Sequence, residues 1–319
     1  MARKLRIQYE GALYHVINRG NYRRDVFETV GAASAFVATL LEATQLHEWH
    51  LHGYAVMRNH YHLAVGTPQA NLVEGMHWLQ STFSTRFNRL RKERGHLFQG
   101  RYHALLIEDA AALSRVVDYI HLNPVRAGVV PPARVAEFRW SSLRQFRQAD
   151  RPKALLCAAW LAHHGWEDNS VGLQHYVSYL IDLAENEAAQ KRMGLEKMSV
   201  GWAIGTQGWR RQVAKDHAHL ALNPGLEAKE LQDFKEMRWR SVLEQGLGSA
   251  GKTVHDIQND VGRSEWKIKL AMQLRESSAP YLWIAENLKM GKPGSVRAYV
   301  FQAKNNRKRP DPFLGNVPN

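Results

Sequence analysis

Two histidines separated by one residue, His60 and His62, lie inside an alternating apolar run over residues 52–65. Successive side chains of a β-strand point to opposite faces of the sheet, so both imidazoles would lie on one face and Tyr61 on the other. Two imidazoles side by side on a rigid strand supply half of a divalent-metal site. The pattern therefore predicts a strand that binds a metal ion through His60 and His62.

A tyrosine and an asparagine four residues apart, Tyr119 and Asn123, form the second chemically capable pair. Residues at this spacing share one face of a helix. A tyrosine hydroxyl is a nucleophile, and an amide oxygen can help to complete the shell of an ion that prefers oxygen. Beside a metal that withdraws charge from a phosphate, this set could cut DNA through a phosphotyrosine. We expect Tyr119 to attack and Asn123 to join His60 and His62 as a metal ligand.

The elements that would hold these groups are predicted from hydrophobic periodicity. The pattern predicts strands at residues 12–19 and 101–107, a hairpin at 52–65, and helices at 32–49, 72–95 and 110–123. The last helix is expected to end at Asn123, because the residue before Pro124 is biased away from helix. The resulting order, β-α-β-β-α-β-α, is typical of an α+β fold of the ferredoxin-like, split-βαβ kind with one added helix.

The remainder of the chain is predicted to be helical, without a second series of strands. Proline-containing stretches near residues 131–132 and 149–152 indicate boundaries. We expect a first domain over residues 1–150, a helical connector over 151–235, a helical domain over 236–303 and a basic tail over 304–319.

Three helices are predicted in the third of these parts, at residues 264–275, 280–288 and 295–303. A glycine turn separates the last two helices, and the last helix is basic, which predicts an all-α helix-turn-helix domain. Its expected core consists of Trp266, Leu270, Leu274, Trp283, Ile284 and Leu288.

Charge and cysteine content narrow the class of protein. Lysine and arginine outnumber aspartate and glutamate by 43 to 30, and the net charge is +13. This balance favours a polyanionic partner, most simply nucleic acid. The single cysteine, Cys157, excludes an intrachain disulfide and suits a reducing compartment. No apolar stretch follows the N-terminus and none could span a bilayer, so we expect neither a signal peptide nor a membrane partner.

Polar, cationic and aromatic side chains around the two chemical pairs are candidates for DNA contacts. They are Arg19, Asn21, Arg23 and Arg24 at the first turn, Arg86 and Arg89 late in the second helix, and His96, Gln99, Arg101 and Tyr102 before the last strand. Arg126 and Arg297 complete the set. For the helical cluster a solvated helix face is an equal alternative, and for the third group the alternative is packing at the entrance of a strand.

Four runs match a family pattern in order and spacing: YHVINRGN at residues 14–21, MRNHYH at 57–62, GHLFQGRY at 95–102 and DYIHLNPVRAG at 118–128. On these runs the chain resembles the single-tyrosine HUH transposases, and within them the REP-associated tyrosine transposases of bacteria. The resemblance covers about residues 5–147. The rest of the chain resembles, much more weakly, the C-terminal extensions of some larger members.

The resemblance implies a ferredoxin-like nuclease domain that binds hairpin-forming single-stranded DNA and depends on Mg²⁺ or Mn²⁺. It implies that Tyr119 forms a covalent 5′-phosphotyrosine, from which a 3′-hydroxyl can later rejoin strands. It also implies a bacterial protein of the cytoplasm, associated with the nucleoid, that works as a monomer or a homodimer. Duplex DNA flanking the hairpin is a further candidate partner.

Two alternatives remain beside this transposase hypothesis. The first is a domesticated, catalytically idle descendant that binds DNA hairpins as a regulator. The second is a hydrolase that uses a metal held by His60 and His62 to activate water. A cleavage assay separates them, because only the transposase forms a covalent protein–DNA adduct.

Two other patterns are interpreted as structural. Residues 246–253, GLGSAGKT, match a phosphate-binding loop, but the preceding residues are charged and helical where that loop needs a buried strand. We therefore expect a helix that stops at the glycines and a second helix capped by Thr253. Cys157, His163 and His164 fit no standard zinc spacing.

Overall fold

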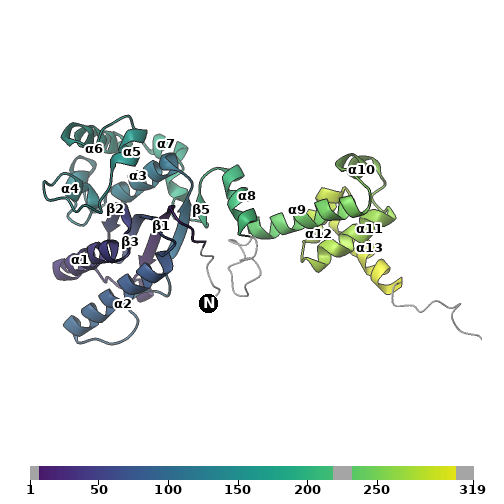
Figure 1. Ribbon diagram of the computed structural model, residues 1–319, viewed down its shortest axis with the longest axis horizontal. Helices are drawn as coiled ribbons and strands as arrows, with labels where there is room; N and C mark the ends of the chain where they lie inside the picture. The colour runs from purple at the N-terminus through teal and green to yellow at the C-terminus, as the bar shows by residue number, and fades with distance from the viewer. Residues whose placement is uncertain (1–6, 218–231, 307–319) are drawn as a thin grey trace, which may run out of the picture. The chain divides into compact units, whose positions relative to one another are not determined.

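The computed structural model describes residues 7–217 and 232–306. The chain divides after Arg210 into two compact units, which we call the sheet unit (residues 7–210) and the helical unit (residues 211–306). Both are shown in Figure 1, and each is described by itself. No helix within the described residues is long and apolar enough to cross a membrane.

The sheet unit contains a five-stranded sheet in the order β2-β3-β1-β4-β5. The strands are β1 (Ala12–Arg19), β2 (His50–Val56), β3 (His60–Thr67), β4 (His103–Ile107) and β5 (Ala203–Ile204). β1 pairs antiparallel with β3 and β4, which gives the predicted ferredoxin-like order for the first four strands. β5 was not predicted. It is a two-residue strand that pairs parallel with β4, too short to show a sequence period.

Helices cover both faces of this sheet (Figure 1). On one face lie α1 (Val30–Leu46) and α2 (Leu72–Arg91), and their side chains surround Tyr61 of β3. The Tyr61 ring lies 4.6 Å from that of Phe36 on α1, and its hydroxyl accepts a hydrogen bond of 2.8 Å from Gln80 on α2. Because side chains alternate along a strand, the neighbouring His60 and His62 point to the other face, toward α3 (Ala110–Arg126).

The helix α3 does not end where the sequence predicts. Asp109 caps its start by accepting a hydrogen bond of 2.8 Å from the Ala112 amide, but the helix runs through Pro124 to Arg126. The predicted end at Asn123 is therefore wrong. Pro124 is buried, and the Asn123 side chain donates a hydrogen bond of 2.9 Å to the Tyr119 carbonyl. Tertiary packing of this last turn overrides the local preference of a residue before proline.

Several short helices pack around α3 and extend the sheet unit well beyond residue 150. They are η2 (Pro132–Glu137), α4 (Ser142–Phe146), α5 (Ala158–His163), α6 (Ser170–Glu185), α7 (Glu187–Arg192) and η3 (Leu195–Lys197). Contacts of α5 and α6 with α3 join this region to the sheet. The first part of the predicted connector, residues 151–210, is thus an integral layer of the sheet unit.

A buried carboxylate ties this layer to α3. Asp118 is fully buried, and its two oxygens accept hydrogen bonds of 3.0 Å from the Tyr176 hydroxyl and 3.1 Å from the Tyr179 hydroxyl, both on α6. His164 Nε2 lies 2.7 Å from the Ser114 hydroxyl of α3. Buried polar groups whose hydrogen bonds are all made hold their elements in one arrangement. These bonds therefore fix the position of α3 against α6.

The helical unit contains α9 (Gln232–Ser249), α10 (Val254–Asn259), α11 (Glu265–Glu276), α12 (Tyr281–Leu288) and α13 (Pro293–Asn306). A further helix, α8 (Gln207–Asp216), spans the residue at which the two units divide. All three predicted C-terminal helices are present. Leu270, Leu274, Ile284 and Leu288 are buried as expected, whereas Trp266 and Trp283 are only partly buried against that core.

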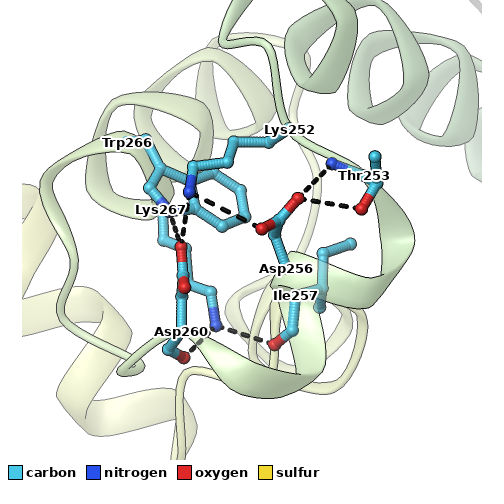
Figure 2. A network of polar contacts seen from close by, with 7 residues as sticks. All are labelled: Lys252, Thr253, Asp256, Ile257, Asp260, Trp266 and Lys267. Atoms are coloured by element: carbon cyan, nitrogen blue, oxygen red, sulfur yellow. Dashed lines mark hydrogen bonds and ion pairs between the residues drawn. The ribbon is translucent and has the colours of Figure 1, made fainter.

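The run that matches a phosphate-binding loop forms a helix end and a cap, as Figure 2 shows. The Lys252 ammonium lies 2.9 Å from an Asp260 oxygen and 3.7 Å from an Asp256 oxygen, so its charge is already paired. Thr253 and Asp256 form a reciprocal capping box at the start of α10. The buried Lys267 donates to the Ile257 and Asp260 carbonyls. The structural interpretation is confirmed, because a strand does not precede the loop.

Candidate active site

The strand β3 presents His60 and His62 on the face covered by α3, and their ring centroids lie 5.0 Å apart. The adjacent strand β1 lies opposite in register, with Arg19 facing His60 and Ile17 facing His62. His62 is 3 % exposed, whereas His60 is only partly buried. The pair therefore has one deep and one accessible imidazole.

Tyr119 meets this pair from α3. Its ring packs edge-on against that of His62, with 5.4 Å between the centroids. The Arg126 guanidinium lies over the Tyr119 ring at 5.0 Å from its centroid, on the side of the last helical turn. The Asn123 amide nitrogen donates a hydrogen bond to the Tyr119 carbonyl, which leaves the amide oxygen available as a ligand. The predicted nucleophile and ligands thus come from facing elements of one unit.

A third histidine, His15 of β1, joins the site and was not predicted. Its Nε2 lies 3.0 Å from His62 Nδ1, and its Nδ1 lies 2.7 Å from the Met198 carbonyl oxygen. Its ring is also 5.7 Å from that of Tyr119. His15 is inside the first family motif, but only the pairing of β1 with β3 and the return of residue 198 to the sheet reveal its partners.

Burial keeps these imidazoles neutral. Desolvation lowers the pKa of His15 to about 4, with a smaller contribution from the charge of His103. Desolvation also lowers the pKa of His62 well below its ordinary value, and the neighbouring His15, His60 and Arg126 add to that effect. The pKa of His60 is lowered by the same cause. A neutral imidazole has the free lone pair that a metal ion needs.

The donor set suits a divalent ion with mixed nitrogen and oxygen preference. Two neutral imidazoles and the Asn123 amide oxygen could hold Mg²⁺ or Mn²⁺, with water in the other positions. Within the described parts of the chain, no group of three or more histidine, cysteine, aspartate or glutamate side chains could hold a metal ion. His60, His62 and Asn123 stay a predicted ligand set.

Comparison with known proteins finds a family model that matches part of the sheet unit. The model of the family described as "Transposase IS200 like" matches residues 8–123, a stretch that includes both histidines, Tyr119 and Asn123. Residues 8–123 are thus similar to the IS200-like transposases. A solved structure of a REP-associated tyrosine transposase bound to a REP hairpin aligns with a TM-score of 0.40 at 16 % identity. That alignment covers 49 % of this chain and 92 % of the other. No curated protein matches the sequence.

At one rim of the sheet unit, two of the motifs that carry the resemblance lie side by side. The Asn21 amide donates to the Leu97 carbonyl at 2.9 Å, and the Gln99 amide donates to the Arg19 carbonyl at 2.9 Å. The Arg19 side chain also hydrogen-bonds the side chain of Gln99. Because Arg19 faces His60 across the strands, this rim begins beside the histidine pair.

Most of the predicted DNA contacts in this domain are exposed at or near this rim. The exposed residues are Arg19, Arg23, Arg24, Arg89, His96, Gln99, Arg101 and Arg126, and Asn21 is partly buried. Arg24 is paired with Glu93 at 2.6 Å, whereas Arg126 packs on the ring of Tyr119. Arg297 is exposed in the helical unit.

Two of the predicted DNA contacts make other contacts within the sheet unit. Tyr102 is only 3 % exposed, so its ring is part of the core and offers no surface for a base to stack on. Arg86 makes hydrogen bonds of 2.9 and 2.8 Å to the Glu42 carboxylate, which joins α2 to α1. Tyr102 fits the alternative of packing at a strand entrance, whereas Arg86 is exposed on α2 and fits the alternative of a solvated helix face.

An exposed aromatic residue at the rim was missed. Tyr22 lies in the short turn η1 (Asn21–Arg23), is 93 % exposed and has a φ of 51°. A positive φ is uncommon for a residue with a bulky side chain and marks a backbone held by its surroundings. An exposed ring flanked by Arg23 and Arg24 is suited to stacking on an unpaired base.

Proposed function

We propose that the sheet unit is a transposase domain, which cleaves single-stranded DNA and keeps one product attached to Tyr119 as a 5′-phosphotyrosine. The observation that supports this best is the contact of the Tyr119 ring with His62, 5.4 Å between centroids, beside a second histidine on the same strand. A nucleophile and two metal-binding nitrogens are thus assembled within one unit.

The reaction would replace one phosphate ester by another. The Tyr119 oxygen attacks phosphorus and loses its proton to solvent, while the bond from phosphorus to the 3′-oxygen breaks. That 3′-oxygen takes up a proton and leaves as a hydroxyl, and the 5′-phosphate stays on the tyrosine. A bound divalent cation supplies charge neutralisation at the phosphate. Because no bond energy is lost, a 3′-hydroxyl can reverse the step and join strands without ATP.

The chain's own residues would prepare this attack. His60, His62 and Asn123 hold the ion, and α3 aims the tyrosine at the sheet. Arg126 lies above the Tyr119 ring, and Arg19 is opposite His60 in the strand register. Two fixed guanidinium groups at such a site can bind the phosphates on either side of the cleaved one.

We further propose that the substrate is a DNA hairpin of the REP type with a single-stranded flank. The family motifs, the basic rim and the exposed Tyr22 support this substrate, since a flank needs backbone contacts and a stacking surface. The solved relative was bound to a REP hairpin.

The test is a denaturing gel with labelled hairpin oligonucleotides and purified full-length protein in Mg²⁺ or Mn²⁺. A labelled band that migrates with the protein supports the proposal. A native-gel shift without cutting would favour the idle hairpin-binding regulator. Cutting without a protein-linked band would favour the hydrolase that activates water.

For the helical unit we propose binding to duplex DNA beside the hairpin. A turn containing Lys289 and Gly291, both at positive φ, joins α12 to α13. Val296 and Val300 anchor α13 in the core, and Arg297 is exposed between them. Residues 287–306 contain four cations, Lys289, Lys292, Arg297 and Lys304, and no acidic residue. This unbalanced charge along the turn and α13 suits binding to phosphates. Of the expected basic tail, residues 304–319, the first three belong to α13 and residues 307–319 lie outside the described residues.

Replacing Lys292 and Arg297 together by glutamine is expected to weaken binding of the full-length protein to a hairpin with a duplex flank. The salt dependence should fall by about one unit of slope for each phosphate that is no longer neutralised. Affinity would be measured at two salt concentrations, with and without the flank. The control is Arg240→Gln, which removes an exposed cation of α9 that is paired with Glu236 at 2.8 Å. Equal affinity and slope for both variants would favour a solubilising or dimerising role.

A further inference from the structure

We propose that His15 is a positioning residue that fixes the tautomer of His62, and that the Met198 carbonyl fixes the tautomer of His15. This inference rests on the metal site proposed above and extends it to residues outside the family match, which ends at residue 123. Its ligand is a divalent cation of the Mg²⁺ or Mn²⁺ class.

The chain of hydrogen bonds allows one arrangement of protons. A carbonyl oxygen only accepts, so His15 Nδ1, 2.7 Å from the Met198 oxygen, must bear the proton of that neutral ring. His15 Nε2 then has a lone pair and accepts from His62 Nδ1 at 3.0 Å. His62 must therefore be protonated on Nδ1, which leaves the lone pair on its Nε2. The opposite tautomer of His15 would place two lone pairs against each other at the Met198 carbonyl.

His60 is held in the same way by a different partner. Its Nδ1 lies 2.7 Å from the Asn59 amide oxygen, and the Asn59 amide nitrogen donates to the Arg23 carbonyl at 3.4 Å, which orients the amide. His60 therefore also bears its proton on Nδ1. Both histidines of the pair present Nε2 lone pairs, and the partner on each Nδ1 fixes the ring orientation, as outer partners do at known metal sites.

The groups that fix the two tautomers come from different distances along the chain. Asn59 is next to His60 in the sequence, whereas Met198 returns from the far end of the sheet unit, just before β5. Pairing of β5 with β4 brings this segment to the sheet, where the Leu106 amide donates to the Trp202 carbonyl at 2.9 Å. The segment that contains Met198, outside the family match, thus fixes the tautomer of His62, the deeper of the two ligands.

The experiment measures histidine tautomers directly in the full-length, metal-free protein. Two-bond ¹H–¹⁵N correlation spectra distinguish a protonated ring nitrogen from one with a lone pair, and a His62→Gln variant identifies the His62 signals by their absence. We expect His62 and His15 to be protonated on Nδ1 alone. A proton on His62 Nε2 in the wild-type protein would overturn the proposal.

A second measurement uses His15→Phe, which keeps a ring in the buried position but removes both hydrogen bonds. Mn²⁺ affinity, followed by the paramagnetic resonance signal of free Mn²⁺, should fall by about 10-fold to 100-fold, the usual effect of losing an outer partner. The control is His103→Phe on β4, which removes a similar bond of 2.7 Å to the Gly201 carbonyl and should leave Mn²⁺ affinity unchanged.

Wild-type Mn²⁺ affinity in His15→Phe, or an equal loss in His103→Phe, would overturn the positioning role. If circular dichroism shows that His15→Phe does not fold, the wild-type tautomers decide the question alone. Neither the tautomer spectra nor the Mn²⁺ titration uses DNA, so both are independent of cleavage. A protein that shows the expected tautomers and Mn²⁺ response but forms no covalent adduct would therefore contradict the proposed function and leave this inference standing.

Discussion

Tyr119→Phe is expected to eliminate the covalent protein–DNA adduct and to lower cleavage on the order of 10³-fold or more, since it removes the attacking oxygen. Hairpin binding should remain nearly unchanged, because the phenylalanine ring keeps the packing against His62 and beneath Arg126. A denaturing gel with labelled single-stranded DNA measures the adduct, and a native gel measures binding.

Tyr22→Phe is the matched control for this substitution. Tyr22 is 93 % exposed at the rim, so its hydroxyl could in principle reach DNA, yet its loss should leave adduct formation intact. An adduct that survives in Tyr119→Phe and disappears in Tyr22→Phe would move the nucleophile from α3 to the rim.

His60→Ala and His62→Ala are each expected to lower cleavage about 100-fold or more, because one of two strand-borne nitrogen ligands is removed. Chelation should have the same effect on the wild-type protein. Asn123→Ala should reduce cleavage less than either, since water can replace an amide oxygen. Cleavage rates across a series of Mn²⁺ concentrations would show whether added metal compensates for the weaker binding.

His77→Ala serves as the control, because His77 is an exposed histidine of α2, on the other side of the sheet. It should behave as the wild-type protein at every Mn²⁺ concentration. Full activity of either His60→Ala or His62→Ala at low Mn²⁺ would show that the ion, if one is used, is held elsewhere.

Local sequence patterns predicted the strands and helices that present the site. β1 begins and ends at the predicted residues, Ala12 and Arg19, because a short, mostly apolar run is closed there by a turn at Gly20 and Asn21. The spacing of His60 and His62 on a strand, and of Tyr119 and Asn123 on a helix, gave the correct faces, since both periods are geometric properties of the backbone.

Relations between distant segments could not be predicted in this way. The bond of His15 to Met198 joins residues 183 positions apart and has no local signature. The burial of Tyr102 and the extension of α3 through Pro124 likewise depend on what packs against them. β5 contains only two residues, fewer than a strand period can reveal.

The arrangement of α3 determines whether two subunits could share one active site. Tyr119 lies against His62 of its own chain, and Asp118, the residue before it, is bonded to two tyrosines of α6 in the same unit. Moving the tyrosine into another subunit would break this buried network. A mixture of Tyr119→Phe and His62→Ala proteins should therefore stay inactive, with no complementation between subunits, and each chain should count as one whole catalyst in an active-site titration.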